Sequence, residues 1–550
     1  MLKYLFSLIL CLSCISFSHG QKNGQSSTIV VTSKKDKTKI YTQKNGKLLV
    51  NVTPKDVDYH KNKGFVLYSE FGALGDGKTN DMDAIAATHA FANLHGLKVQ
   101  ADAGYTYYIG GKERTAIVET DTDFGTAAFI IDDTEVANRT ASIFLVSSSQ
   151  EPFKLKGISR LKRNQEKIDI SLPQPCLVTV TNSNVKHYIR YGLNQNNGSP
   201  QTDIFVVDKK GNVDMDAPII WDFDQITEAT ALPMDQTTLT ISGGRFTTIA
   251  NKAESKYNYY SRNIAIRRSN VVVENLEHLV IGEGVQGAPY GGFINIRDCA
   301  YVTVKNTVLT GHKTYKTIGS AGKPVSMGTY DAVVNSALNV TFLNCSQTND
   351  INDRTYWGIL SSNYSKNLVY DNCTFSRFDA HKGVANATIR NSTLGHMGIN
   401  AIGSGVLTID NSTIRGNSLV NLRPDYGSTW QGDIIIRNCV FVPSGGRSSN
   451  PSLISGSYSG NHNFGYTCYM PKNIIIEGLH IDDSNHPEDY QGPAIIKDFN
   501  KEWTNDSYQE TFPYVLNTKI VLKNVSTASG NELRLSNNPF MFKDVQLYTD

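Results

Sequence analysis

The sequence lacks several features that mark common protein classes. Beyond the N-terminus, no hydrophobic run is long enough to cross a membrane. The net charge is only +2 over 550 residues, and no run of Lys or Arg resembles a nucleic-acid-binding stripe. After residue 20 there is no Cys-x-x-Cys pair, so a zinc site is not indicated. We therefore expect no nucleic-acid partner, no membrane span and no resident metal cofactor.

The N-terminus, MLKYLFSLILCLSCISFSHGQ, is typical of a secretory signal peptide. Lys3 supplies the positive charge, residues 5–17 supply a short apolar core, and Ser18-His19-Gly20 forms a small-x-small cleavage site. We predict that residues 1–20 are removed and that the protein is secreted or periplasmic. Lipid anchoring at Cys14 is the weaker alternative, because the residues before this cysteine match a lipidation signal poorly.

Internal repetition is the strongest pattern in the chain. The repeated unit is an alternating strand rich in β-branched residues, followed by Asn and a small residue, as in VTFLNCS (340–346), LVYDNCT (368–374), ATIRNST (387–393) and LTIDNST (407–413). The Asn residues of six such units are 19 to 38 residues apart and stand at positions 306, 344, 372, 391, 411 and 438. About 20 residues is the length of one coil of a β-solenoid, so longer spacings indicate loops inserted into coils.

This repeat predicts an all-β fold, a right-handed parallel β-helix. No helical periodicity separates the strands, and stacked coils about 4.8 Å apart would bury the repeated apolar positions. The Asn residues are expected at bends, with left-handed backbone and side-chain amides bonded between coils. Cys345, Cys373 and Cys439 follow these Asn residues and should point inward, and a disulfide between neighbouring coils is left open.

The segment at residues 64–111 contains FGALGDGKTNDMDAI. It resembles the opening of pectate-lyase-superfamily β-helices, in which a turn leads into a capping helix. The resemblance implies that residues 64–145 form the N-terminal cap and first coils, preceded by a leader at 21–63. We expect Asp76, Asp81 and Asp83 to serve the turn and the helix N-cap.

The repeat is lost between residues 146 and 235, where strands alternate around Asn-Gly and Lys-Gly turns. We predict a β-rich insertion there and assign residues 236–550 to the main solenoid. Arg190, Tyr191, Asn194 and Trp221 of the insertion could contact sugar, although a structural role is the simpler interpretation.

Polar and charged residues recur after the Asn bends of successive coils, where stacking should bring them to one face. Histidine is scarce, with 12 in 550 residues, yet His381 and His396 fall in adjacent coils near Asp379. Such residues could simply be polar side chains exposed to solvent, but their grouping favours a functional cleft. The candidates are Asp350, Asp353, Arg354, Tyr356, Trp357, Asp379, His381, Lys382, His396, Asn400, Arg415 and Arg423.

Around residues 350–425 the chain also resembles the polygalacturonase-type glycoside hydrolases. INDRTYWGI (351–359), RFDAHKG (377–383), GHMGINAIGS (395–404) and VNLRPD (420–425) fall in the order of that family's motifs. The resemblance implies that Asp353 and Asp379 are catalytic carboxylates, that His396 tunes them and that Arg423 binds substrate. Ala380, Met397 and Pro424 depart from the family pattern.

Glycoside hydrolysis needs one protonated and one ionised carboxyl group. Strand geometry places Asp353 and Asp379 about 8 Å apart, the separation of an inverting enzyme, whereas Asp350 with Asp379 would suit a retaining one. His396, His381 and Lys382 would set the protonation states. Tyr356 and Trp357 could stack on a sugar, and Arg354, Asn400, Arg415 and Arg423 could bind it. The predicted substrate is an acidic, plant or host polysaccharide.

Two alternatives remain open at this point. A polysaccharide lyase would use Lys382, His381 or an arginine on a uronate, and Asp350 with Asp353 could then hold Ca²⁺. A non-catalytic glycan-binding β-helix would bind without cleaving. For an enzyme, alanine at Asp353, Asp379 or His396 should abolish cleavage without unfolding the protein. Oligomeric state, sugar identity and linkage are not determined by the sequence.

Overall fold

The computed structural model describes residues 29–34, 39–111, 113–138, 140–190, 197–252, 260, 262–283, 291–313, 315–318, 324–327, 330–358, 360–443, 451–516 and 519–549. The predicted signal peptide, the alternative anchor at Cys14, and Tyr191 and Asn194 lie outside the described residues. Within the described part, no helix is both long and apolar enough to cross a membrane.

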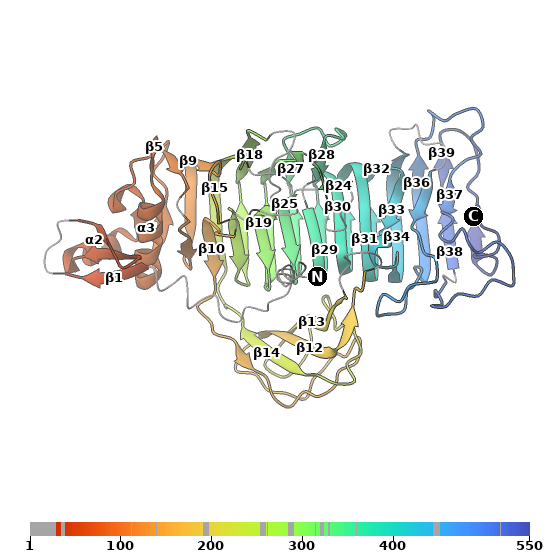
Figure 1. Cartoon of the computed structure of the whole chain (residues 1–550), viewed down its shortest axis with the longest axis horizontal. Coiled ribbons are helices and arrows are strands. Elements are labelled where there is room, and N and C mark those ends of the chain that lie inside the picture. The colour runs from red at the N-terminus through yellow and green to blue at the C-terminus, as the bar shows by residue number, and fades with distance from the viewer. Residues whose placement is uncertain are drawn as a thin grey trace, which may run out of the picture.

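The N-terminal end combines a small sheet with two helices (Figure 1). Strands β1 (Ile29–Ser33), β2 (Tyr41–Lys44) and β3 (Lys47–Val52) form a three-stranded sheet in the order β1-β3-β2. Helix α2 (Pro54–Lys63) follows, capped by Thr53. After β4 (Phe65–Leu67), the 3-10 turn η2 (Ser69–Phe71) and β5 (Asp76–Asn80), helix α3 (Met82–His95) joins the solenoid core through Phe91.

The acidic residues of the cap serve the structure in three ways. Asp76 accepts hydrogen bonds from the amides of Lys78 and Thr79 in its own turn. Asp81 occupies the N-cap position of α3, but its carboxylate accepts from the amides of Leu74 and Gly75, so the side chain holds the preceding turn and makes no bond to the helix. Asp83 pairs with Arg114.

The main body is a right-handed parallel β-helix, which confirms the predicted fold class. Among the described residues, 29 strands join one sheet that winds along the long axis of the molecule (Figure 1). Besides β4 and β5, its strands are β6 (Lys98–Gln100), β7 (Thr106–Ile109), β8 (Ala116–Val118), β9 (Thr122–Asp132), β10 (Phe144–Ser147), β15 (Leu239–Ile249), β16 (Ile264–Arg267), β17 (Val271–Glu274), β18 (Glu277–Ile281), β19 (Gly291–Arg297), β20 (Ala300–Lys305), β21 (Val308–Leu309), β25 (Tyr330–Asn335), β26 (Leu338–Leu343), β27 (Ser346–Gln347), β29 (Leu360–Asp371), β30 (Thr374–Arg390), β31 (Thr393–Asp410), β32 (Thr413–Gly416), β33 (Ser418–Leu422), β34 (Trp430–Pro443), β35 (Ser452–Ser455), β36 (Asn473–Ile481), β37 (Ala494–Ile496), β38 (Lys519–Lys523), β39 (Ser526–Thr527) and β40 (Gln546–Thr549).

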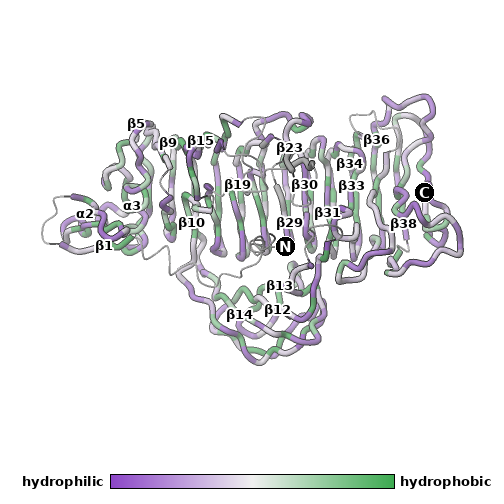
Figure 2. Tube along the Cα trace, in the orientation of Figure 1, coloured by the Kyte–Doolittle hydropathy of each residue, from purple (hydrophilic) through white to green (hydrophobic). Residues whose placement is uncertain are grey.

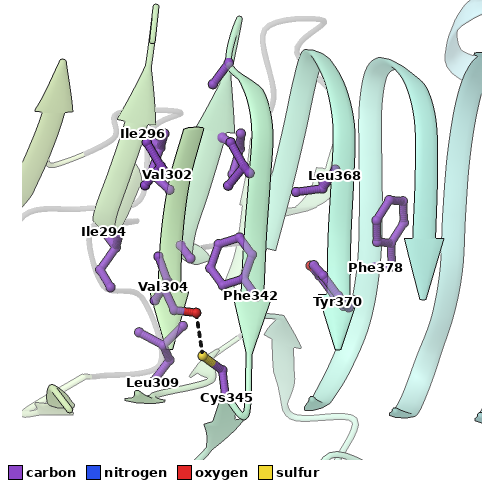
Figure 3. Close-up of a cluster of buried hydrophobic side chains, with 14 of the residues drawn as sticks. Ile294, Ile296, Val302, Val304, Leu309, Phe342, Cys345, Leu368, Tyr370 and Phe378 are labelled. Atoms are coloured by element: carbon purple, nitrogen blue, oxygen red, sulfur yellow. Dashed lines mark hydrogen bonds between the residues drawn. The ribbon is translucent and has the colours of Figure 1, made fainter. Parts of the chain in front are cut away.

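Alternation of apolar and polar residues explains the solenoid core, because every second side chain of a strand points inward. Hydrophobic and hydrophilic positions alternate along the solenoid strands (Figure 2). In the parallel register Val340 pairs with Leu368, Leu368 with Ala387, and Ala387 with Leu407, so equivalent residues stack from coil to coil. Figure 3 shows such inward side chains, among them Phe342, which is fully buried.

The recurring Asn residues occupy the predicted bends. All six have positive φ, between 44° and 54°, a conformation that Asn tolerates better than most residues. The amide of Asn372 donates to Asn344 at 2.9 Å, and that of Asn411 donates to Asn391 at 2.9 Å. Cys345, Cys373 and Cys439 are buried, as the inward-facing prediction requires, and none of them forms a disulfide. The thiol of Cys345 lies against the Val304 carbonyl (Figure 3).

Residues between β10 and β15 build a separate antiparallel sheet beside the middle of the solenoid (Figure 1). Its strands are β11 (Phe153–Lys154), β12 (Cys176–His187), β13 (Ser199–Val207) and β14 (Glu228–Pro233), in the order β11-β14-β12-β13. Asp203 of this sheet pairs with Lys366 of β29 at 2.7 Å, and both side chains are almost fully buried. The insertion is therefore held against the solenoid by a desolvated ion pair.

Two short antiparallel sheets accompany the solenoid. β22 (His312–Lys313) pairs with β28 (Tyr356–Gly358), which is distant in sequence, and β23 (Tyr315–Ile318) pairs with β24 (Pro324–Met327). The 3-10 turn η3 (Pro424–Tyr426) follows β33. β28 carries the candidate residue Tyr356, and η3 follows directly after Arg423.

Candidate functional site

Asp379 lies at the centre of the candidate site, on β30, and its side chain is completely buried. Its carboxylate accepts two hydrogen bonds from Nη1 of Arg423, at 2.7 and 3.0 Å, and forms a close ion pair with Arg377. The Tyr330 hydroxyl lies 3.5 Å away. Burial alone would raise the pKa of Asp379, but Arg377 and Arg423 hold it below its ordinary value. Asp379 is thus a fixed anion between two guanidinium groups.

A series of ion pairs connects the Asp379 carboxylate with the insertion. Arg423 follows β33 and also bonds Asp425 through Nε at 3.0 Å. Asp425 in turn pairs with Arg190 at 3.0 Å, and Arg190 follows β12 of the insertion. The insertion therefore helps to position the candidate site, a contribution that sequence spacing alone could not indicate.

His381 and Lys382 stand beyond Asp379 on the same strand. Burial lowers the pKa of His381 to about 4, so the imidazole is neutral near pH 7. Its ring lies 5.6 Å from that of Tyr426. The Lys382 ammonium lies 5.9 Å from the ring centroids of both Tyr364 and Tyr426, a cation–π arrangement. The Lys382 charge is thus held against two aromatic rings of the candidate site.

His396 lies on β31 under the loop at residues 348–356. The backbone amide and Nδ1 of His396 are each 3.0 Å from the Ile351 carbonyl. Gly395 is required at this contact, because a Cβ there would stand 1.9 Å from that carbonyl oxygen. Asp350 and Asp353 lie in the same loop, where each accepts a hydrogen bond from an amide two residues later. The loop is thus fixed against the histidine.

The environment of His396 favours a neutral imidazole with a defined tautomer. Burial, supported by the charges of Arg354 and Arg377, lowers its pKa, while the Ile351 carbonyl and Asp353 oppose this shift. Because a carbonyl can only accept, Nδ1 carries the proton and Nε2 has the lone pair. Asp353 is solvent-facing, and backbone and side-chain bonds from Thr355 lower its pKa. The arrangement supplies a general base beside two arginines.

The remaining predicted residues occupy several positions around this cluster. Asn400 aligns with Asp379 in the next coil, and its side chain accepts from Asn421 at 2.8 Å. Arg354 is exposed, and Tyr356 and Arg415 are half-buried. The side chain of Trp357 lies outside the described residues. Asp331 is fully buried and contacts His278 at 2.7 Å.

The structure therefore groups the candidates into two connected parts. The charges of Asp353, Arg354 and Arg377 act on His396, whereas those of Asp379, Lys382 and Arg423 act on His381. Sequence reasoning missed Tyr330, Tyr364 and Tyr426, which come from loops and strands outside the aligned motif. In the described part of the chain, no group of three or more His, Cys, Asp or Glu residues could hold a metal ion.

Comparison with known proteins gives a short sequence match and a long structural one. No family model matches the chain. A capsule KL64-specific depolymerase of Klebsiella phage P510 is 25% identical over 147 residues, which cover 22% of this chain and 14% of that protein. The match thus spans a small part of the depolymerase.

Among solved structures, the tailspike gp61 of Pseudomonas phage phi297 has a TM-score of 0.52 at 13% identity, covering 88% of this chain and 84% of the tailspike. The tailspike gp49 of Pseudomonas phage LKA1 has a TM-score of 0.50 at 12% identity, with the same coverage. At such identities the likeness concerns the fold, and this chain shares the right-handed parallel β-helix of those tailspikes.

Proposed function

We propose that this protein is a secreted carbohydrate-active enzyme that cleaves an acidic polysaccharide at the cluster around His396 and Arg377. The observation that carries the proposal is the 3.0 Å contact of His396 Nδ1 with the Ile351 carbonyl, which places the lone pair of the neutral ring on Nε2, within the electrostatic influence of Arg354 and Arg377. The partial similarity to a capsule depolymerase supports a polysaccharide as the substrate class.

The cluster is better suited to β-elimination than to hydrolysis. In elimination on a uronate, Arg354 would neutralise the sugar carboxylate and so acidify the adjacent C5–H bond. Nε2 of His396 would take that proton, C4 and C5 would become doubly bonded, and the C4–O bond to the leaving sugar would break. The departing oxygen would take a proton from solvent. This chemistry needs no protonated carboxyl group.

Hydrolysis is the second candidate, because Asp350 and Asp353 lie on one exposed loop beside His396. A hydrolase also needs a carboxyl group that keeps its proton. The pKa values of Asp353 and Asp379 are both lowered, so neither is suited to that role near neutral pH. We propose that Asp379 is a positioning residue that holds Arg377 and Arg423, in place of the catalytic role inferred from the family resemblance.

The purified protein can be tested on acidic and neutral polysaccharides, with detection of both ultraviolet absorbance and new reducing ends. Elimination gives unsaturated, absorbing products, whereas hydrolysis gives reducing ends without added absorbance. His396→Gln should lower the rate by about 10²- to 10⁴-fold, the usual contribution of a general base. His480→Gln, at an exposed histidine on β36, is the matched control. If the wild type gives neither absorbance nor new reducing ends on any polysaccharide, the proposed function is refuted.

A further inference from the structure

The ion pairs around Asp379 lead to a group of charged side chains at the boundary between the solenoid and the insertion. Its members are four cations and two anions, namely Arg190, Arg377, Lys382 and Arg423 with Asp379 and Asp425. Ion pairs connect the arginines and the carboxylates in series. The Lys382 ammonium and the Arg190 guanidinium each lie 5.9 Å from the centroid of the Tyr426 ring. We call these six charged residues the basic cluster.

The basic cluster has an excess of two positive charges, because its four cations face two carboxylates. Both carboxylates are ionised near pH 7, since the neighbouring arginines outweigh the effect of burial and the pKa of Asp379 and that of Asp425 are lowered. His381 adds no charge there, because burial lowers its pKa to about 4. Cations that are partly withdrawn from water repel one another, so binding of an anion at the cluster is favourable.

The excess charge is accessible at one end of the basic cluster. The side chains of Arg377 and Asp379 are buried, whereas 39% of the Arg190 side chain is exposed and Lys382 is half-buried. Because Arg190 and Lys382 are equally distant from the Tyr426 centroid, an anion near the midpoint between them would lie within about 6 Å of each. This distance is below the Debye length of about 8 Å at physiological salt, so both cations attract the same anion.

The surrounding groups hold these two cations in place without neutralising them. Lys382 lies 5.9 Å from the ring centroids of both Tyr364 and Tyr426, and an aromatic ring attracts a cation although it carries no net charge. Arg190 donates to Asp425 through Nη2 at 3.0 Å, and a guanidinium has five N–H groups, so Arg190 can hold a second acceptor as well. The fixed positions reduce the entropy that the two side chains lose when an anion binds.

The accessible end of the basic cluster is separated from the proposed base. Arg377, whose charge acts on His396, lies on β30, and Lys382 follows it by five positions in the same strand. At about 3.3 Å per residue, the two positions are up to about 16 Å apart. An anionic group bound at Lys382 therefore belongs to a different sugar unit from the one that loses its proton to His396.

We propose that Lys382 and Arg190 bind the carboxylate of an acidic sugar at the surface of the basic cluster, away from the sugar that is cleaved. The choice of a sugar rests on the proposed function, whereas the choice of a carboxylate rests on the excess charge of the cluster. The proposal selects polysaccharides that carry acidic sugars at more than one position. The insertion then takes part in substrate selection, since Arg190 follows β12.

Calorimetry can test the subsite with acidic oligosaccharides prepared from pectate, alginate and hyaluronan, each compared with its own methyl ester. Esterification removes the negative charge and keeps the sugar chain. Binding is measured on the wild type for every probe that it leaves intact, and otherwise on His396→Gln. At least one acidic oligosaccharide should bind, and its ester should bind at least about 10-fold more weakly, the usual loss for a charge-assisted hydrogen bond.

Lys382→Met and Arg190→Met keep the aliphatic stems and should each weaken binding of the acidic oligosaccharide about 10-fold. Lys382→Arg keeps the charge and should retain binding. Two control variants, Lys519→Met and Arg160→Met, should leave binding unchanged. Lys519 is an exposed lysine 5.0 Å from the Tyr548 ring, and Arg160 is an exposed arginine of the insertion.

Three outcomes would overturn the subsite. They are failure of every acidic probe to bind, equal binding of acid and ester, and equal binding by the wild type, Lys382→Met and Arg190→Met. Urea unfolding guards against misfolding, because both methionine variants should unfold at the wild-type urea concentration. Weaker binding that accompanies earlier unfolding, with no recovery in Lys382→Arg, would assign the effect to folding and would also overturn the subsite.

The same measurements separate this inference from the proposed function. Binding that depends on the carboxylate, on Lys382 and on Arg190, in a protein that cleaves no polysaccharide, would leave the subsite standing and refute the enzyme. Cleavage of an acidic polysaccharide with a KM unchanged in Lys382→Met and in Arg190→Met would do the opposite.

Discussion

Nη1 of Arg423 lies 2.7 Å from Oδ1 of Asp379, although the two residues are 44 positions apart in sequence. Asp379 aligns with Asn400, and Asn400 aligns with Asn421, so Arg423 reaches back over two coils, about 10 Å along the solenoid. Arg377 pairs with the same carboxylate from the other side. The buried anion therefore fixes two cations of the candidate site at once.

Asp379→Asn is expected to lower the free energy of unfolding by about 3–5 kcal/mol, because it removes a buried negative charge that pairs with both Arg377 and Arg423. The sequence alone had suggested that a wall residue could be replaced without loss of stability, but Asp379 is completely buried. Urea unfolding measures the difference. Asp506→Asn breaks an exposed pair with Lys543 and should cost less than about 1 kcal/mol. Equal stability of the two variants would contradict the buried pairing.

Gly395→Ala should lower activity more than stability. The added methyl group would collide with the Ile351 carbonyl and displace the loop that carries Asp353 and Arg354 away from His396. We expect kcat/KM to fall by about 10²-fold, since small misplacements of catalytic groups are costly. Gly111→Ala, where a Cβ meets no atom within 4 Å, is the matched control. Unchanged cleavage by the Gly395 variant would show that the loop takes no part.

The pH dependence of cleavage should reflect His396. Burial lowers its pKa below the ordinary value of 6.5, and the neutral form is the base. The kcat/KM should therefore be constant from pH 8 down to about pH 6.5 and fall only at lower pH, where the imidazole takes up a proton. An acid limb centred well above 6.5 would show that a different group acts as the base.

Folding stability should decrease at mildly acidic pH because buried histidines resist protonation. Burial lowers the pKa of His187 and of His381 to about 4 in the folded protein, against 6.5 for an unperturbed histidine. The unfolded chain thus binds more protons between these values, so stability is full above pH 6.5 and is lost as pH falls toward 4. Each histidine contributes a slope of up to about 1.4 kcal/mol per pH unit.

Urea unfolding at several pH values between 7.5 and 4.5 tests this slope. Lowered carboxylate pKa values, such as that of Asp379, affect stability only nearer pH 4, and the comparison of variants separates His381 from the other groups that titrate in this window. His381→Gln should reduce the slope, whereas His480→Gln, at an exposed position, should leave it unchanged. Identical slopes in both variants and the wild type would show that folding does not lower the pKa of His381.

The fold could be predicted because each coil contains, within its own sequence, the local features that define its strands and bends. Strand alternation, the left-handed Asn at the bend and the small inward residue after it are local features, and they recur at Asn372, Asn391 and Asn411. Stacking then follows, because the apolar face of one coil can be buried only against the next. The approximate position of the polar cluster also follows from this stacking.

The roles within that cluster depend on the tertiary structure. Sequence spacing placed Asp379 near His381 and His396, but its burial depends on Arg423 from two coils away and on the covering loops. The contribution of Arg190 depends on how the insertion docks, through an ion pair between Asp203 and Lys366. The sequence by itself determined the coils, their stacking and the approximate region where the polar residues gather, since these arise from local, repeated patterns. Only the tertiary structure decided which carboxylate is paired with two arginines and which histidines are buried, because contacts between distant, non-repeating segments set burial and charge.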